Sequence, residues 1–275
     1  MVGIAAAESA VKPRVVSLDW ALAETMLAIG VTPVAVVAAD DWAQLVVEPA
    51  LPASVADLGL AQDVNFELIA DLRPTLILTS PFLKNLEHTL RRIAPVVPLS
   101  VFDEGGAPLG QRRVVTLTLG DLLDRHLEAE QYLERAEQTF DAERTRLAAL
   151  SPRPLLLLNF IDARHVRVYG GSSLYQNVLA RLGLSNAWNR PTGYFGYATV
   201  GVEQLATDRD LHCIVFDPVP PDAGPTLRDS PLWSRLPFVR AGHVSFLPPT
   251  LMFGAMPAAL RFARLLTTTL EAVAS

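Results

Sequence analysis

The chain has 275 residues, half of them apolar, so it can bury the core of one large domain or of two lobes of ordinary size. Its formal net charge is −6, without acidic or basic blocks and with only two lysines, which argues against nucleic acid as a partner. The single cysteine, Cys213, excludes an internal disulfide and a cage of thiolate metal ligands.

The N-terminal segment and the overall hydropathy bear on location. No apolar run reaches the roughly 18 residues of a transmembrane helix, so none is predicted. Residues 1–12 are mostly small and lack a basic region followed by a long apolar one, so they are not an intact signal peptide. They suit the start of a processed secreted chain, and a cytosolic N-terminus is the alternative.

The first hundred residues alternate between short apolar strands and helices. Strands are expected at 14–20, 33–38, 75–79 and 96–102, and helices at 21–29, 66–72 and 85–93. This alternation predicts a lobe with a mainly parallel sheet flanked by helices. The glycine-rich stretch 102–111 follows, and because it lacks the G-x-G-x-x-G spacing we interpret it as a connection.

The stretch 119–149 is amphipathic, with apolar residues every three or four positions between Asp, Glu and Arg. No glycine or proline interrupts it from Asp121 to Leu150, which predicts one rigid helix about 45 Å long at ~1.5 Å per residue. The alternative, a coiled-coil strand, would cover only about four heptads. We therefore expect an N-terminal lobe at 12–118, a linking helix at 119–150 and a C-terminal lobe at 151–275.

The C-terminal part repeats the α/β pattern. Strands are expected at 155–161, 164–169, 211–217 and 244–247, and helices at 174–182, 202–207 and 257–274, while 186–197 is an aromatic-rich loop and 218–225 a surface loop. The predicted fold class is thus α/β, with two lobes joined by one long rigid helix. Such lobes leave a cleft between them, and open α/β sheets bind ligands beyond the carboxyl ends of their strands.

The sequence holds little that indicates catalysis or a resident metal. The five histidines are scattered without metal-ligand spacing, and nucleophile motifs such as G-x-S-x-G are missing. Asp162 and His165 could form an acid/base pair of an α/β enzyme, although a turn between strands explains them equally well. No catalytic residue, protein metal ligand or cofactor is predicted.

Aromatic side chains at strand ends and in loops are more informative. Tyr194, Phe195 and Tyr197 lie among glycines in a loop, where they suit the wall of a ligand site. Trp42, Phe82 and Phe253 are also expected to face the cleft. Trp20 and Phe160 are explained at least as well as core residues.

Several blocks of the sequence resemble a known family. RVVSLDW near the N-terminus, then IDARHVRVYG with SSLYQNVL, and PLWSRLPFVRAG are similar to the periplasmic ferric-hydroxamate siderophore-binding proteins of the ferrichrome type. The resemblance implies the class III binding-protein fold and a role in an ABC importer. It implies a ferric siderophore ligand whose chelator alone binds the iron, an inner-membrane permease as partner, a periplasmic location and a monomer without enzyme activity.

The resemblance also shows where the ligand site departs from the family. The arginine and tyrosine that bind the hydroxamate oxygens in the ferrichrome binder fall here at Ala61 and Leu83. Its pocket tryptophans fall near Leu45, Phe195 and Leu251, and a pocket tyrosine near Phe253. The aromatic bowl is kept but the strong donors are lost, and a charge-assisted bond such as that of the arginine is worth roughly 1.5–3 kcal/mol.

Two explanations for the lost donors remain open. Either Lys84, Arg190 and Tyr197 supply donors from new positions, or the ligand is another siderophore, such as a carboxylate or mixed one. Cobalamin or haem is a more distant alternative, with Tyr194 or Tyr197 as an axial haem ligand. The resemblance further implies one permease-docking acid on each lobe, at Glu87 and Glu203.

Overall fold

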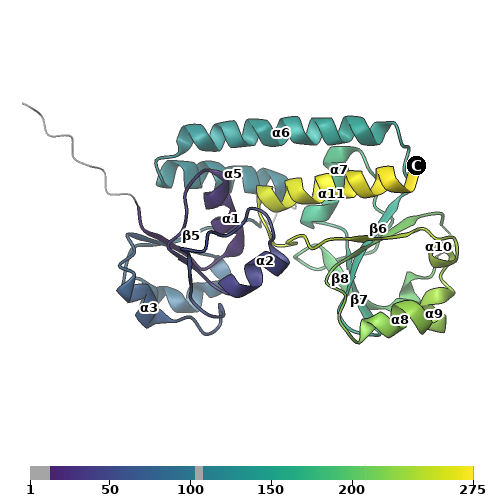
Figure 1. The fold of residues 1–275 in the computed structure, drawn as a ribbon, viewed down its shortest axis with the longest axis horizontal. Helices are drawn as coiled ribbons and strands as arrows, with labels where there is room; N and C mark the ends of the chain where they lie inside the picture. Colours follow the sequence, from purple (N-terminus) through teal and green to yellow (C-terminus); the bar gives the residue numbers. More distant parts are fainter. Residues whose placement is uncertain (1–12, 103–107, 208, 275) are drawn as a thin grey trace, which may run out of the picture.

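The computed structural model describes residues 13–102, 108–207 and 209–274, and Figure 1 shows them as two α/β lobes lying side by side beneath a layer of helices. Two lobes were expected and are confirmed. Residues 1–12, interpreted above as the start of a secreted chain, and residues 103–107 of the glycine-rich connection lie outside the described residues. No helix in the described ranges is long and apolar enough to span a membrane.

The N-terminal lobe is built on a parallel sheet, as predicted. Its strands lie in the order β3-β2-β1-β4-β5, and in the centre Val16 pairs with both Ala35 and Ile77. Because helices cover both faces, the central strands are short runs of buried apolar residues. The strands are β1 (Val15–Ser17), β2 (Ala35–Val36), β3 (Ala56–Asp57), β4 (Leu76–Thr79) and β5 (Val96–Pro98).

Short helices connect these strands. They are α1 (Trp20–Ala28), η1 (Ala39–Asp41), α2 (Trp42–Leu45), α3 (Phe66–Asp71), η2 (Pro81–Leu86) and α4 (Glu87–Leu90). Asn65 caps α3, since its side chain accepts a hydrogen bond from the backbone N–H of Leu68 at 2.9 Å. The strand β3 was not predicted, because two residues are too few to show an alternating pattern.

The C-terminal lobe has a mixed sheet in the order β10-β9-β6-β7-β8, in which β7 runs antiparallel to both neighbours. Its strands are β6 (Leu155–Phe160), β7 (His165–Tyr169), β8 (Tyr197–Gly201), β9 (His212–Phe216) and β10 (Val244–Leu247). Its helices are α7 (Leu174–Leu182), η3 (Val202–Leu205), α8 (Ala223–Asp229), α9 (Pro231–Ser234), α10 (Pro237–Arg240) and α11 (Met256–Ala274). The expected loop at 186–197 therefore leads into an edge strand, and α8 begins inside the stretch expected to be a surface loop.

The single helix predicted over 119–150 is wrong. The chain forms α5 (Pro108–Leu122), reverses direction, and continues as α6 (His126–Ala148). The break needs neither glycine nor proline, because Asp124 adopts the left-handed conformation at φ 53° that aspartate tolerates better than most residues. Gly120 lets the two helices meet, since a Cβ there would lie 2.7 Å from the Cβ of Ala129.

The unbroken helix α6 nevertheless extends along both lobes, with α5 and α11 packed beneath it (Figure 1). Buried polar side chains hold the segment before α11 against the N-terminal lobe. The Glu24 carboxyl group on α1 accepts a hydrogen bond from the backbone N–H of Ala255, and the Arg112 Nε on α5 donates to the Gly254 carbonyl at 2.6 Å. This segment, which leads from β10 into α11, carries residues of the cleft.

Candidate ligand-binding cleft

A cleft with a volume of about 580 Å³ lies between the lobes. Its N-terminal wall is formed by residues that directly follow β1, β2, β4 and β5, as expected for the carboxyl ends of a parallel sheet. The described lining residues are Leu18, Asp19, Trp20, Ala21, Val37, Ala38, Asp41, Leu60, Ala61, Gln62, Ser80, Phe82, Leu83, Ser100, Val101, Phe102, Phe195, Leu251 and Phe253. Most are apolar, so the cleft suits a ligand with an apolar surface.

Aromatic rings from both lobes meet at one side of the cleft. The Phe102 ring centroid lies 5.2 Å from that of Phe195 and 5.8 Å from that of Phe253, both in edge-to-face geometry. The Phe82 ring lies 5.5 Å from Phe195 and is 55% exposed. These contacts fill one side of the cleft and leave ring faces and edges available to a bound molecule.

The position of Phe195 follows from a tight turn. The N–H of Gly196 donates to the Gly193 carbonyl at 2.9 Å, and Gly196 has the left-handed φ of 75°. A Cβ on Gly196 would overlap the backbone of Ser173, the residue that caps α7. Only glycine therefore allows the loop to pack so closely, and the packing directs Phe195 toward the cleft.

The charges that line the cleft are carboxylates. Asp19 caps α1 by accepting hydrogen bonds from the N–H groups of Ala21 and Leu22, and burial raises the pKa of its carboxyl. Asp41 is exposed at the rim. No lysine or arginine is among the described residues that line the cleft.

The structure brings half of the predicted ligand residues together at the cleft. From the N-terminal lobe these are Ala61, Phe82 and Leu83, and from the other side Phe195, Leu251 and Phe253. Ala61 and Leu83, at the positions where the resemblance placed an arginine and a tyrosine, present only apolar atoms.

Three other predicted residues of the N-terminal lobe lie elsewhere. Trp42 is 1% exposed in the core, where its indole N–H donates to the Pro49 carbonyl at 2.8 Å and its ring meets Trp20 edge to face. Leu45 is half-buried on α2 and does not line the cleft, and Lys84 is exposed on η2, also away from the lining.

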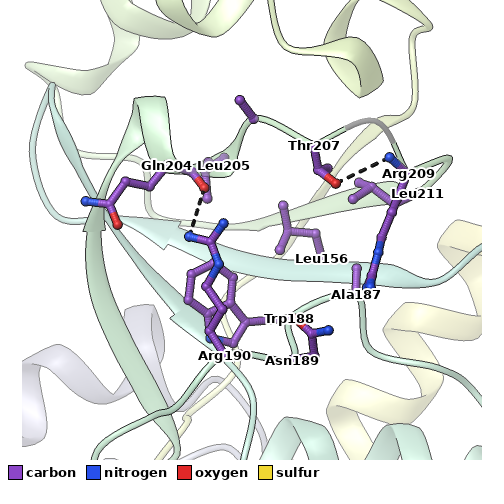
Figure 2. Close-up of a pocket in the computed structure, with 11 residues that line it drawn as sticks. Leu156, Ala187, Trp188, Asn189, Arg190, Gln204, Leu205, Thr207, Arg209 and Leu211 are labelled. Carbon is purple, nitrogen blue, oxygen red and sulfur yellow. Dashed lines mark hydrogen bonds between the residues drawn. The ribbon is translucent and has the colours of Figure 1, made fainter.

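Arg190 belongs to a second cavity, of about 210 Å³, inside the C-terminal lobe. Figure 2 shows its guanidinium stacked over the Trp188 ring, 5.1 Å from the centroid, and donating to the Gln204 carbonyl at 3.4 Å. This cavity also contains Arg209, whose N–H donates to the Thr207 hydroxyl at 3.3 Å. Arg190 is therefore not a donor to the inter-lobe cleft.

The two predicted tyrosines lie beside the cleft and not in its lining. Tyr194 is 52% exposed, with its ring 5.1 Å from Phe195. Tyr197 is half-buried and nearly parallel to Phe195, at a centroid distance of 6.4 Å. The guanidinium of Arg167 lies over the Tyr197 ring. Sequence reasoning did not identify Arg167.

The proposed docking acids lie on short helices of the two lobes. Glu87 begins α4 and forms an ion pair with Arg91 at 3.1 Å, with 21% of its side chain exposed. Glu203 is exposed on η3, and its carboxylate folds back over Gly201. A partly exposed ion pair of this kind contributes little stability, so pairing with Arg91 does not prevent Glu87 from pairing with another cation.

The alternative of an enzyme loses its geometric basis. The His165 Nδ1 lies 3.0 Å from an Asp162 carboxylate oxygen, but the pair is half exposed on the turn between β6 and β7 and lines neither cavity described above. The same carboxylate accepts the backbone N–H groups of Arg164 and His165, which is a turn-forming role. Among the described residues, no three His, Cys, Asp or Glu side chains are grouped as metal ligands.

Some cleft residues were missed although a sequence signal existed. Ser80 directly follows a predicted strand, whereas Asp19 and Phe102 fall in the last residues of strands that were predicted longer than β1 and β5 are. Including the last residues of each predicted strand with those that follow it would have covered all three. Arg167 lies inside a strand, where the pattern alone gives no indication of which face is exposed to the cleft.

Comparison with curated proteins places this architecture among binding proteins. The chain is 34% identical over 253 residues to the iron(3+)-hydroxamate-binding protein FhuD of Escherichia coli, covering 92% of this chain and 85% of the relative. It is 29% identical over 244 residues to the achromobactin-binding periplasmic protein of Dickeya dadantii, covering 84% of this chain and 77% of the relative.

A solved structure and a family model agree with these relatives. The siderophore-binding protein FhuD of Vibrio cholerae, in its complex with ferric Desferal, superposes with a TM-score of 0.90 at 31% identity, covering 96% of this chain and all of the other. Residues 15–251 match the family model for periplasmic binding proteins. These relatives are binding proteins and not enzymes. The chain therefore belongs to the periplasmic binding protein family.

Proposed function

We propose that this protein binds a ferric hydroxamate siderophore in the inter-lobe cleft and delivers it to an ABC permease. The observation that carries the proposal is the cleft itself, which is apolar and aromatic and has no lysine or arginine among its described lining residues. The related FhuD proteins bind iron(3+) hydroxamate and ferric Desferal, respectively. Both observations point to the same ligand class.

The charge of the cleft favours a hydroxamate over a carboxylate chelate. A ferric trihydroxamate is neutral at its metal centre, because three hydroxamate charges balance the iron, and its linkers include alkyl segments. An anionic carboxylate chelate would need at least two cations in the cleft, whereas Lys84 and Arg190 do not line it and Asp19 and Asp41 do. Repulsion from these carboxylates would weaken its binding.

Iron is cargo in this proposal and not a cofactor of the protein. The chelator supplies all ligands of the metal, and the protein contacts the outside of the complex. Rings such as Phe82, Phe195 and Phe253 suit the alkyl segments of the linkers. The protein binds the complex as a monomer in the periplasm.

Delivery to the permease would use one acid on each lobe. Glu87 and Glu203 lie on different lobes, and both would pair with cations of the permease. We expect Glu203→Arg to lower siderophore uptake by cells while leaving the affinity of the purified protein unchanged. Equal uptake by the variant would exclude Glu203 from this role.

Fluorescence titration tests the binding proposal. Trp20 lines the cleft and its ring lies 6.2 Å from that of Trp42, so a bound ferric chelate should quench both. Ferric Desferal should quench saturably, iron-free Desferal and ferric citrate much less, and Trp20→Phe should reduce the amplitude without abolishing binding. Failure of every ferric hydroxamate to bind, judged also by calorimetry, would refute the proposal.

A further inference from the structure

Arg167 lies on β7 and contacts Tyr197 and Met252, two residues that adjoin the cleft lining. It pairs with Asn159 across β6 and with Thr199 across β8, and cross-strand partners present their side chains on the same face. Its guanidinium lies 4.5 Å from the Tyr197 ring centroid, and its Nη1 lies 3.6 Å from the sulfur of Met252. Met252 is flanked by two residues of the cleft lining, so Arg167 stands directly beside that wall.

The hydrogen bonding of Arg167 is incomplete. Its Nε is buried and has no hydrogen-bond partner among the described residues, and no described carboxylate forms an ion pair with it. The nearby Asn159 Oδ1 accepts a hydrogen bond from the Tyr169 hydroxyl at 2.6 Å. Burying a cation without an anionic partner costs free energy. Such an arrangement is therefore unusual unless another molecule provides the partner.

Neighbouring rings hold this cation in place. Tyr197 stacks on the guanidinium, and its ring is in turn nearly parallel to Phe195 of the lining. A guanidinium fixed in this way keeps its remaining N–H groups oriented at little entropic cost. The arrangement is that of a positioned donor and not of a freely moving surface side chain.

We propose that Arg167 is the cationic donor of the ligand site and that it hydrogen-bonds the hydroxamate oxygens of the bound chelate from the C-terminal side. The inference rests on the proposed function and supplies the strong donor that Ala61 and Leu83 cannot provide on the opposite wall. One such cation suits a chelate that is neutral at its iron, because its N–H groups meet oxygens that carry partial negative charge. Tyr197 acts as a positioning residue by stacking on the guanidinium.

Matched substitutions test this role. Arg167→Met removes the donors and keeps an unbranched side chain, and Arg190→Met makes the same change in the cavity of Figure 2. With ferric Desferal as the probe, we expect Arg167→Met to weaken binding by about 10- to 100-fold, the usual range for a hydrogen bond to a charged group. Arg190→Met should leave the affinity within about twofold, and Arg167→Lys should recover part of the loss because it restores a cation.

Controls separate the possible failures. Urea unfolding of each variant establishes that it is folded, and Arg167→Gln replaces Arg167→Met if the latter is not. An affinity of Arg167→Met equal to that of the wild type, or an equal loss in Arg190→Met, would overturn the inference while the proposed function stands. If the wild-type protein itself binds no ferric hydroxamate, the proposed function fails first.

Discussion

Burial strongly opposes the ionisation of Glu24. It is fully buried where α1 meets the segment before α11, and its Oε2 has no hydrogen-bond partner among the described residues. Burial raises its pKa to about 8, although the N–H of Ala255 and the charge of Arg112 act in the opposite direction. At neutral pH the folded protein therefore retains a proton on Glu24.

This retained proton makes stability depend on pH. Between the ordinary value of 4.5 and about 8, the folded state holds a proton that the unfolded chain has released, so the free energy of unfolding falls as the pH rises. Glu24→Gln removes this dependence. We expect its stability advantage over the wild type, measured by urea unfolding, to grow from pH 5 to pH 8; a constant difference would contradict the assigned pKa.

At the same scale, the predictability of the site depended on where each residue lies in its element. Phe195 and Phe253 could be predicted because aromatic rings among glycines or after a strand have few core positions open to them. Trp42 could not be separated from the ligand residues, since a four-residue helix buries it in a way that no periodicity indicates. Arg167 was missed because the residues that hold its guanidinium, Tyr197 and Met252, lie far from it in the sequence.

At the scale of elements, the turn 193–196 sets the geometry of the cleft wall. Gly196→Ala would place a Cβ against the Ser173 backbone and displace Phe195. Gly242→Ala is the matched control, because Gly242 has nearly the same φ, 74° against 75°, and open space around its Cβ position. Both variants should lose about 1–2 kcal/mol of stability from the left-handed backbone, but only Gly196→Ala should also lose affinity for ferric Desferal.

Equal affinity of the two alanine variants, measured by calorimetry, would show that the turn does not position the wall.

The helices and strands themselves were largely predictable, and α7 was predicted with its observed bounds. The break between α5 and α6 was not, because Asp124 carries no stronger signal for a left-handed residue than the other aspartates of this helical stretch. The reversal is decided by the packing of Gly120 on Ala129, which the local pattern cannot reveal.

At the scale of the whole molecule, several contacts resist relative motion of the lobes. The helix α6 extends along both lobes without a break. On α11, Arg261 and Arg264 pair with Glu48 of the N-terminal lobe at 2.5 and 2.6 Å. The buried contacts of Glu24 and Arg112 add to this junction. The two-lobe arrangement was predictable from the repeated α/β pattern, whereas these contacts join residues more than a hundred positions apart.

Ligand binding should accordingly move the lobes by only a few degrees. Small-angle X-ray scattering with and without ferric Desferal should give the same radius of gyration within error. A clear compaction on binding would mean that the junction opens, and that the rigidity inferred from α6 and α11 is wrong.

The position of the iron tests the central claim most directly. Crystals of the protein grown with ferric Desferal, measured at the iron absorption edge, should show one anomalous peak in the cleft that Phe82 and Phe195 border, with Arg167 directed at the chelate and every iron ligand supplied by the chelator. A peak coordinated by protein carboxylates, or located in the Arg190 cavity with the cleft empty, would contradict the account.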